Sequence, residues 1–241
     1  MNELETLNEF LSYPLNSVDE IMERFATLPN AEKRVGNDYQ QQFVFVRGNR
    51  EDAVTLVAHA DTVFKNCAKH EFSEENGIIQ SDTYGVGLGA DDRAGCAILW
   101  LLKDSGHHLL ITDGEEEGQF GAKWLIHSNP DIAEIIHNSS FMIQFDRRNG
   151  TDCKYYYIPV SEEFKEYIEQ ETGYMESDRN SRTDIVTLCD NQNSCCGVNL
   201  SVGYYNEHTP NESLNIEEWA NTLKLVKVML NKPIKRFTLE N

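Results

Sequence analysis

The chain has 241 residues, with 21 basic and 40 acidic side chains, so its formal net charge is −19 at neutral pH. This acidity argues against nucleic acids and anionic membranes as partners, because clustered lysine and arginine bind phosphate groups. No apolar run approaches the roughly 18 residues of a membrane span, and the first residues do not resemble a signal peptide. We therefore expect a cytoplasmic protein that folds as one domain, residues 1–241.

The first half of the chain alternates between helical and strand patterns. Apolar residues at helical spacing predict two short helices in the first thirty residues. Strands are predicted at 42–47 and 53–58, and the second is apolar almost throughout, as expected for a strand covered on both faces. Residues 72–89 are irregular and rich in glycine, which indicates a loop or a small hairpin. A buried helix is predicted over 91–103.

The second half continues this alternation. The predicted strands are 108–112, 141–145 and 199–205, and the predicted helices are 121–127, 161–172 and a final one from Asn215 to about Leu230. Strands that alternate with helices predict a three-layer α/β/α sandwich around a mostly parallel central sheet. Ligands of such sheets bind at the carboxyl ends of the strands, so the chemistry should be found there.

Side chains that bind metals follow the predicted strands. One strand runs into His59-Ala60-Asp61, and another into an acidic run that contains Glu115 and Glu116. A carboxylate close to a ligating histidine can hold its second ring nitrogen. A single histidine at a strand end is nevertheless more often packed or solvated, and an acidic run is more often a solvated loop. Neither segment is specific by itself.

Two adjacent carboxylates, Asp91 and Asp92, stand at the start of a predicted helix, after glycines 85, 87 and 89. The glycine spacing does not match a dinucleotide-binding loop, and the negative charges oppose a phosphate at that position. The two carboxylates suit a cation better, although they also complement the helix dipole.

Five segments therefore present metal-binding side chains in the order His59, Asp91, Glu115-Glu116, Asp146 and His208. Imidazole nitrogens and carboxylate oxygens are ligands of borderline cations such as Zn²⁺. These residues are more ligands than one tetrahedral metal ion can bind while it keeps a position open for water. It suits two metal ions that share a bridging carboxylate, with a spare glutamate for proton transfer.

The order of these motifs resembles that of the co-catalytic zinc exopeptidases, the clan that includes the M20, M28 and M42 metallopeptidases. The matching segments are His59-Ala60-Asp61, Gly89-Ala90-Asp91-Asp92-Arg93-Ala94-Gly95, Glu115-Glu116-Glu117-Gly118, Asp146 and His208-Thr209-Pro210-Asn211-Glu212. The resemblance implies a zinc-exopeptidase, phosphorylase/hydrolase-like fold.

The resemblance also implies a role for each matching residue. Asp91 would bridge the two metal ions, and the other ligands would be His59 and Asp146 in one site and Glu116 and His208 in the second. Glu115 would be the general base, and Asp61 would orient the ring of His59. In the family the peptide bond between Asp91 and Asp92 would be cis.

The implied cofactors are two divalent ions, with Zn²⁺ as the first choice and Co²⁺ or Mn²⁺ as alternatives. The implied reaction is hydrolysis of a peptide or related amide bond by an aminopeptidase or other exopeptidase, with small peptides or N-acyl amino acids as substrates. M20 enzymes carry a lid and dimerisation domain after the motif of Asp146, whereas residues 147–178 of this chain suffice for one helix. We therefore expect a catalytic domain without a lid, as a monomer or weak oligomer.

Two other functions remain open. A thiol amidase would use Cys195 or Cys196 with His208, although these cysteines lie in a polar segment without an evident third group to orient the histidine. The six cysteines include no CxxC pair, so we expect reduced thiols. A metal-binding but inactive peptidase-like module is the second alternative, and the presence of Glu115 argues against it.

Residues that contact the substrate are harder to predict. Candidates for neutralising an oxyanion or a carboxylate are Arg147, Arg148, Arg179, Arg182, Tyr204 and Tyr205. For each of them, a surface arginine or a core tyrosine is the more common explanation.

Overall fold

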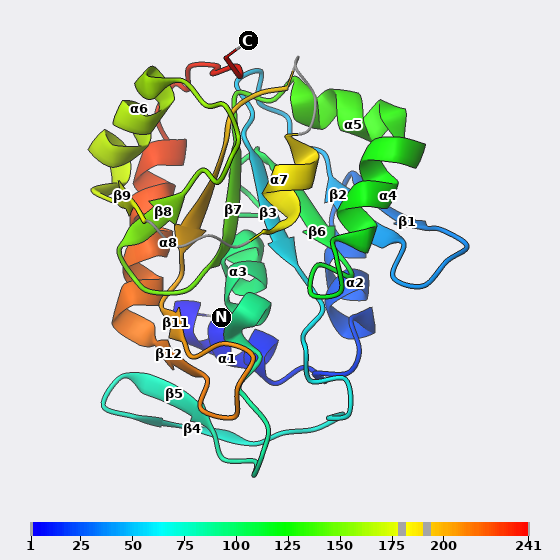
Figure 1. Cartoon of the computed structure of the whole chain (residues 1–241), viewed down its shortest axis with the longest axis vertical. Coiled ribbons are helices and arrows are strands. Elements are labelled where there is room, and N and C mark those ends of the chain that lie inside the picture. Colours follow the sequence, from blue (N-terminus) through cyan, green and yellow to red (C-terminus); the bar gives the residue numbers. More distant parts are fainter. Residues whose placement is uncertain (1, 178–181, 190–193, 241) are drawn as a thin grey trace.

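The computed structural model describes residues 2–177, 182–189 and 194–240, and contains two β-sheets (Figure 1). The strands of the main sheet, in spatial order, are β1 (Ala31–Val35), β2 (Gln42–Val46), β6 (His108–Thr112), β3 (Thr55–His59), β7 (Met142–Arg147), β10 (Gly197–Ser201), β8 (Asp152–Lys154) and β9 (Met175–Glu176). The strands of the second sheet are β11 (Tyr204–Tyr205), β12 (Ser213–Asn215), β5 (Ile78–Ser81) and β4 (Phe72–Glu75).

The helices within these residues surround the main sheet. They are α1 (Glu3–Leu11), α2 (Asp19–Ala26), α3 (Ala90–Leu101), α4 (Phe120–Ser128), α5 (Pro130–His137), α6 (Glu162–Thr172), α7 (Asp184–Leu188) and α8 (Ile216–Leu230). No helix in the described ranges is both long and apolar enough to cross a membrane.

The four central strands of the main sheet, β6, β3, β7 and β10, run parallel to one another. Antiparallel pairs lie on either side of them, where β2 pairs with β6 and β8 pairs with β10. Every residue of β3, β6 and β10 is buried, which shows that both faces of this part of the sheet are covered. The predicted sandwich with a mostly parallel central sheet is therefore confirmed.

Helix α3 is the central helix of the core. It packs on β3 and β7, and α1 packs against α3 in turn. Trp219 on α8 is buried, and its indole N–H donates a hydrogen bond to the carbonyl of Ala94 on α3 at 3.1 Å. These contacts hold the first turn of α3, which carries Asp91, close to the carboxyl ends of the strands.

The predicted strand 199–205 is wrong in part, because the structure divides it into β10 and β11. Gly203 lies between them with a φ of +84°, and its N–H donates to the carbonyl of Asn149 at 2.7 Å. A left-handed residue of this kind favours glycine and turns the chain out of the main sheet. The turn sends β11 into the small sheet, which Figure 1 shows below the main one.

The described part of the segment after Asp146 adds elements to the main sheet rather than a separate lid. Strand β8 pairs with β10, β9 pairs with β8, and α6 packs against α8. Sequence periodicity did not predict β1, α5 or α7. β1 lies at the edge of the sheet and has three consecutive charged residues between Ala31 and Val35, and α7 is only one turn and a half long.

Candidate metal centre

The carboxyl ends of the parallel strands bring the predicted site residues together. His59 is the last residue of β3, Asp146 is the penultimate residue of β7, and Glu115 and Glu116 follow β6. Parallel strands end at the same edge of a sheet, so residues far apart in the chain meet there. The first turn of α3 adds Asp91 from below this edge.

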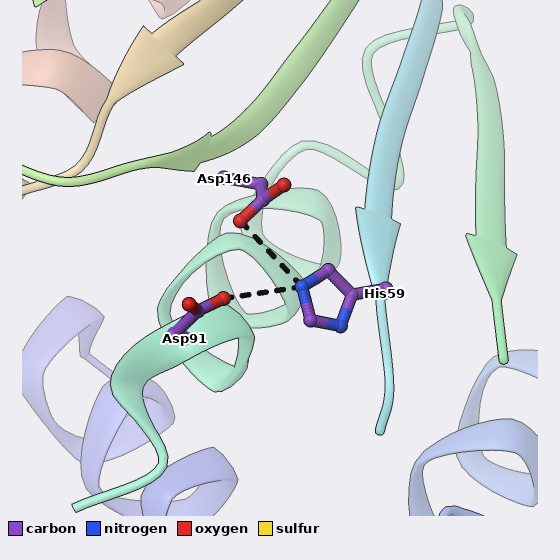
Figure 2. A group of neighbouring side chains, drawn as sticks. All are labelled: His59, Asp91 and Asp146. Atoms are coloured by element: carbon purple, nitrogen blue, oxygen red, sulfur yellow. Dashed lines mark hydrogen bonds and ion pairs between the residues drawn. The ribbon is translucent and has the colours of Figure 1, made fainter. Parts of the chain in front are cut away.

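The first group of ligand-type side chains is His59, Asp91 and Asp146 (Figure 2). The Nε2 atom of His59 lies 3.1 Å from Asp91 Oδ1 and 3.5 Å from Asp146 Oδ1. All three side chains are at most 8% exposed. One imidazole nitrogen and two carboxylate oxygens thus converge in a protected space.

The second group is Asp91, Glu116 and His208. The Nε2 atom of His208 lies 3.0 Å from Asp91 Oδ2 and 2.9 Å from Glu116 Oε2. Asp91 therefore directs one oxygen to each histidine and belongs to both groups. His208 is 47% exposed, so this group is the one that faces solvent.

Asp61 lies behind the two groups and contacts both of them. Its Oδ1 atom is 3.3 Å from Nδ1 of His59 and accepts the backbone N–H of Glu115 at 3.1 Å. Its Oδ2 atom accepts the N–H of Glu116 at 3.3 Å. A fully buried carboxylate thus orients the histidine ring and fixes the start of the acidic loop.

Electrostatics within the site are strongly perturbed. Burial opposes ionisation of Asp91, yet contacts with His208 and His59 hold its pKa below the usual range. Hydrogen bonds to Asp91 and Glu116 raise the pKa of His208 to about 11. Burial and the charge of Asp91 raise the pKa of Glu116 to about 7. Both shifts favour the protonated forms of His208 and Glu116, as expected where buried carboxylates concentrate negative charge and attract positive charge.

Glu115 has the environment of a proton-transfer group. Burial raises its pKa well above the usual value, and the charges of Asp146, Asp184 and Glu116 act in the same direction. The side chain lines the cleft that also contains Asp91, Asp146 and His208.

The residues fit two bound divalent cations. Each group offers one imidazole and two carboxylates, the donor set of borderline metals, and a shared Asp91 suits a bridging ligand. The Oε1 atom of Glu116 is buried and has no hydrogen-bond partner among the described residues. A metal ion would satisfy this oxygen, which otherwise carries the cost of an unpaired buried acceptor.

Asp146 is held by Gln144 and Thr183, which sequence reasoning missed, and by Tyr204, which it named only as a substrate contact. Its Oδ2 atom accepts hydrogen bonds from Gln144 Nε2, at 3.1 Å, and from the hydroxyl of Thr183. The hydroxyl of Tyr204 donates to the other oxygen, Oδ1, at 3.2 Å. Thr183 precedes α7 and is 37 positions away in the chain, so no local pattern could indicate this contact.

The peptide bond between Asp91 and Asp92 is cis, which confirms the expectation drawn from the resemblance. Asp92 points away from the two groups. Its Oδ2 atom accepts the N–H of His59 at 3.1 Å, and its Oδ1 atom accepts the N–H of Gly95 at 3.0 Å. The two adjacent carboxylates therefore differ, because Asp91 faces the cleft and Asp92 accepts a hydrogen bond from the backbone of β3.

The cleft above the two groups contains four of the predicted substrate-contact residues, Arg147, Arg148, Arg182 and Tyr204. Arg147 is buried and paired with Asp152 at 2.8 Å, and Arg148 is paired with Glu207 at 2.5 Å. The hydroxyl of Tyr205 instead donates to Glu218 at 2.7 Å. Arg179 lies outside the described residues.

Cys195 and Cys196 lie away from His208. They precede β10, whereas His208 lies beyond its far end, and a five-residue strand spans about 16 Å. Both thiols are buried, and burial raises the pKa of Cys195 to about 12. The Sγ atoms donate to the carbonyls of Ile136 and Thr238. This geometry gives no support to a thiol nucleophile paired with His208.

Solved structures with the same fold include several peptidases. Aminopeptidase PepT from Bacillus cereus ATCC 10987 matches 96% of this chain and 100% of its own, with a TM-score of 0.68 and 16% identity. The TET1 peptidase of Pyrococcus horikoshii, which can assemble into a tetrahedron or a large octahedral shell, matches 95% of this chain and 99% of its own, with a TM-score of 0.66 and 14% identity.

A third example is the aminopeptidase APDkam598 from the archaeon Desulfurococcus kamchatkensis. It matches 96% of each chain, with a TM-score of 0.67 and 12% identity. No protein-family model matches the sequence, and no curated protein matches it. The likeness therefore establishes a shared fold, and the chain has the α/β fold of these aminopeptidases.

Proposed function

We propose that the protein is a dinuclear metal-dependent hydrolase that cleaves peptide or related amide bonds, and that it acts as an exopeptidase on small peptides. The observation that carries this proposal is the meeting of two His-Asp-carboxylate groups that share Asp91, with Glu115 beside them. The fold shared with aminopeptidases supports it. Zn²⁺ is the proposed metal, and residues 1–241 are the proposed catalytic domain.

In this proposal His59, Asp91 and Asp146 hold one ion, and Asp91, Glu116 and His208 hold the other. When bound, two such ions lower the pKa of a shared water and polarise the substrate carbonyl. The three carboxylate ligands supply negative charge that neutralises most of the charge of the ions. Asp61 keeps the ring of His59 turned so that Nε2 faces the cleft.

Glu115 is the proposed general base. Its carboxylate accepts the proton of the nucleophilic water and returns it to the leaving amine, a contribution of roughly 10²- to 10⁴-fold to the rate. The backbone N–H of Glu115 donates a hydrogen bond to Asp61, which fixes the start of the acidic loop. The same carboxylate therefore positions both the base and the ring of His59.

The charge of the molecule bears on the substrate. The net charge of −19 repels strongly acidic peptides, so neutral and basic peptides are the proposed substrates. The described part of residues 147–178 forms no lid domain, so the cleft is bounded by the proposed catalytic domain itself. A monomer or weak oligomer remains the proposed state, and light scattering on the purified chain tests it.

The test is metal content combined with a variant of the base. We expect about two metal ions per wild-type chain and hydrolysis of unmodified di- or tripeptides. Glu115→Gln should retain both ions and lose turnover by roughly 10²- to 10⁴-fold. Glu117→Gln is the matched control, because Glu117 belongs to the same acidic run but is 42% exposed and outside both groups.

The results separate the alternatives. A chain that takes up no metal would refute the proposal, and a fully active Glu115→Gln variant would remove Glu115 from the mechanism. Two bound ions without turnover on any peptide or N-acyl amino acid would favour the inactive metal-binding module instead.

A further inference from the structure

Glu212 lies four residues after His208 and belongs to neither of the two ligand groups. Its side chain is 1% exposed, and both carboxylate oxygens accept backbone N–H groups from the segment that enters α3. Oε1 accepts the N–H of Asp91 at 3.0 Å, and Oε2 accepts the N–H of Gly89 at 2.8 Å. One buried carboxylate therefore ties the loop of His208 to the backbone of Asp91.

The surrounding chain makes room for this carboxylate. A Cβ atom at position 87 would lie 2.7 Å from Glu212 Oε2 and 2.6 Å from the carbonyl oxygen of Thr209. Real side chains do not tolerate such approaches, so Gly87 is required where the two loops meet. Gly87 thus serves the packing of one loop on another.

His208 depends on such support because its own backbone belongs to neither a strand nor a helix. It lies in the loop between β11 and β12, and its backbone has a φ of +63°, which is uncommon for residues other than glycine. Glu212 ends this loop and directly precedes β12, which pairs with β5 in the small sheet. The loop is thus anchored to the small sheet on one side and to Asp91 on the other.

His59 has separate supports. It belongs to the fully buried strand β3, its ring is held by Asp61, and its backbone N–H is held by Asp92. The two histidines therefore differ, because His59 is fixed by the main sheet and His208 by the contact through Glu212.

We propose that Glu212 is a positioning residue for the second metal site, which sets the distance between His208 and Asp91 before metal binds. This inference rests on the proposed dinuclear function. Its consequence is that loss of Glu212 weakens the site of Asp91, Glu116 and His208 selectively. Supporting groups around metal ligands typically contribute about 10- to 100-fold to affinity.

The test compares Zn²⁺ affinities of Glu212→Gln and wild type. Glutamine has one acceptor oxygen and an amide that itself donates, so it satisfies at most one of the two N–H groups. We expect one of the two binding steps to lose about 10- to 100-fold in affinity. Glu117→Gln, which removes an exposed charge nearby, should bind both ions as wild type does.

A second pair of variants assigns the effect to one site. In a His208→Ala background one Zn²⁺ should bind at the site of His59, and adding Glu212→Gln should leave that affinity unchanged. Equal weakening in both backgrounds would overturn the inference, because Glu212 would then act on Asp91 or on the fold in general. Unchanged affinity of Glu212→Gln in the wild-type background would also overturn it.

A readout without metal completes the experiment. In the metal-free protein, the amides of Gly89 and Asp91 should exchange with solvent faster in Glu212→Gln than in wild type, while amides of β3 remain protected. Unchanged exchange at both amides would refute the contact itself. If the wild-type protein binds no Zn²⁺, the dinuclear site and this inference are refuted together. If the wild type binds two ions and Glu212→Gln binds them with unchanged affinity, only the role of Glu212 is refuted.

Discussion

Replacing Thr183 by valine tests how the first metal site is held. The hydroxyl of Thr183 donates to Asp146 Oδ2, while the other oxygen of Asp146 approaches His59. The side chain is 2% exposed, and valine has nearly the same shape. The substitution therefore removes two hydrogen bonds, the one donated to Asp146 and the one that the hydroxyl accepts from Gln144 Nε2 at 2.6 Å, and little packing. Asp146 should lose part of its orientation toward His59.

The expected magnitude follows from the contacts that remain. A hydrogen bond to a charged group contributes about 1.5–3 kcal/mol, and about 1.4 kcal/mol corresponds to tenfold in affinity. Gln144 still donates to the same oxygen at 3.1 Å, so the lower end applies. We expect about tenfold weaker Zn²⁺ binding at the site of His59. Calorimetric titration of the metal-free protein measures this value, in a His208→Ala background that leaves one site.

Thr187→Val is the matched control for this experiment. Thr187 lies on the same helix, α7, and its hydroxyl donates to Gln119 Oε1 at 2.7 Å, outside both metal groups. It should leave Zn²⁺ affinity unchanged. The reasoning is refuted if Thr183→Val binds as tightly as its parent, or if Thr187→Val weakens binding by the same factor.

Three further predictions concern pH, stability and inhibition. Zn²⁺ affinity should fall as pH falls, because protons compete with the metal for His59 and His208. Asp146 helps to raise the pKa of His59, and Asp91 helps to raise the pKa of His208. Burial raises the pKa of Asp184 to about 7, so its ionisation destabilises the metal-free fold as pH rises from about 4 to 7. Asp184→Asn should therefore gain a few kcal/mol relative to wild type at pH 8 but not at pH 4, measured by urea unfolding. Chelation should abolish peptidase activity, and iodoacetamide should spare it because the cysteines of the described chain are buried.

Each of these predictions has an outcome that contradicts it. Zn²⁺ affinity that stays constant from pH 8 to pH 5 would show that no proton competes with the metal. A stability difference between Asp184→Asn and wild type that does not change with pH would place the effect in packing rather than charge. Inactivation by iodoacetamide together with resistance to chelation would reverse the assignment in favour of a thiol enzyme.

Local sequence sufficed for the strands and helices whose patterns are strong. The apolar runs at 108–112 and 141–145 coincide with β6 and nearly with β7, and the predicted final helix is α8. Asn215 caps α8 by accepting the N–H groups of Glu217 and Glu218, a contact between neighbours in the chain that its sequence indicates.

Elements with weak local signals were decided by their neighbours in space. The charged strand β1 forms because β2 offers it an antiparallel partner along its whole length. β6 lies between β2 and β3, although it follows both in sequence. Pairing order of this kind depends on which faces pack together, and a hydrophobic pattern does not encode it.

For the site, the sequence by itself determined which residue types follow each strand, and the order of the motifs carried the resemblance to a peptidase clan. The contacts that orient these side chains were decided only by the tertiary structure. Thr183 reaches Asp146, and Glu212 reaches Asp91 across 121 positions of the chain. A hydrogen bond needs its two atoms within about 3 Å, and only the packing of separate elements brings such distant residues that close.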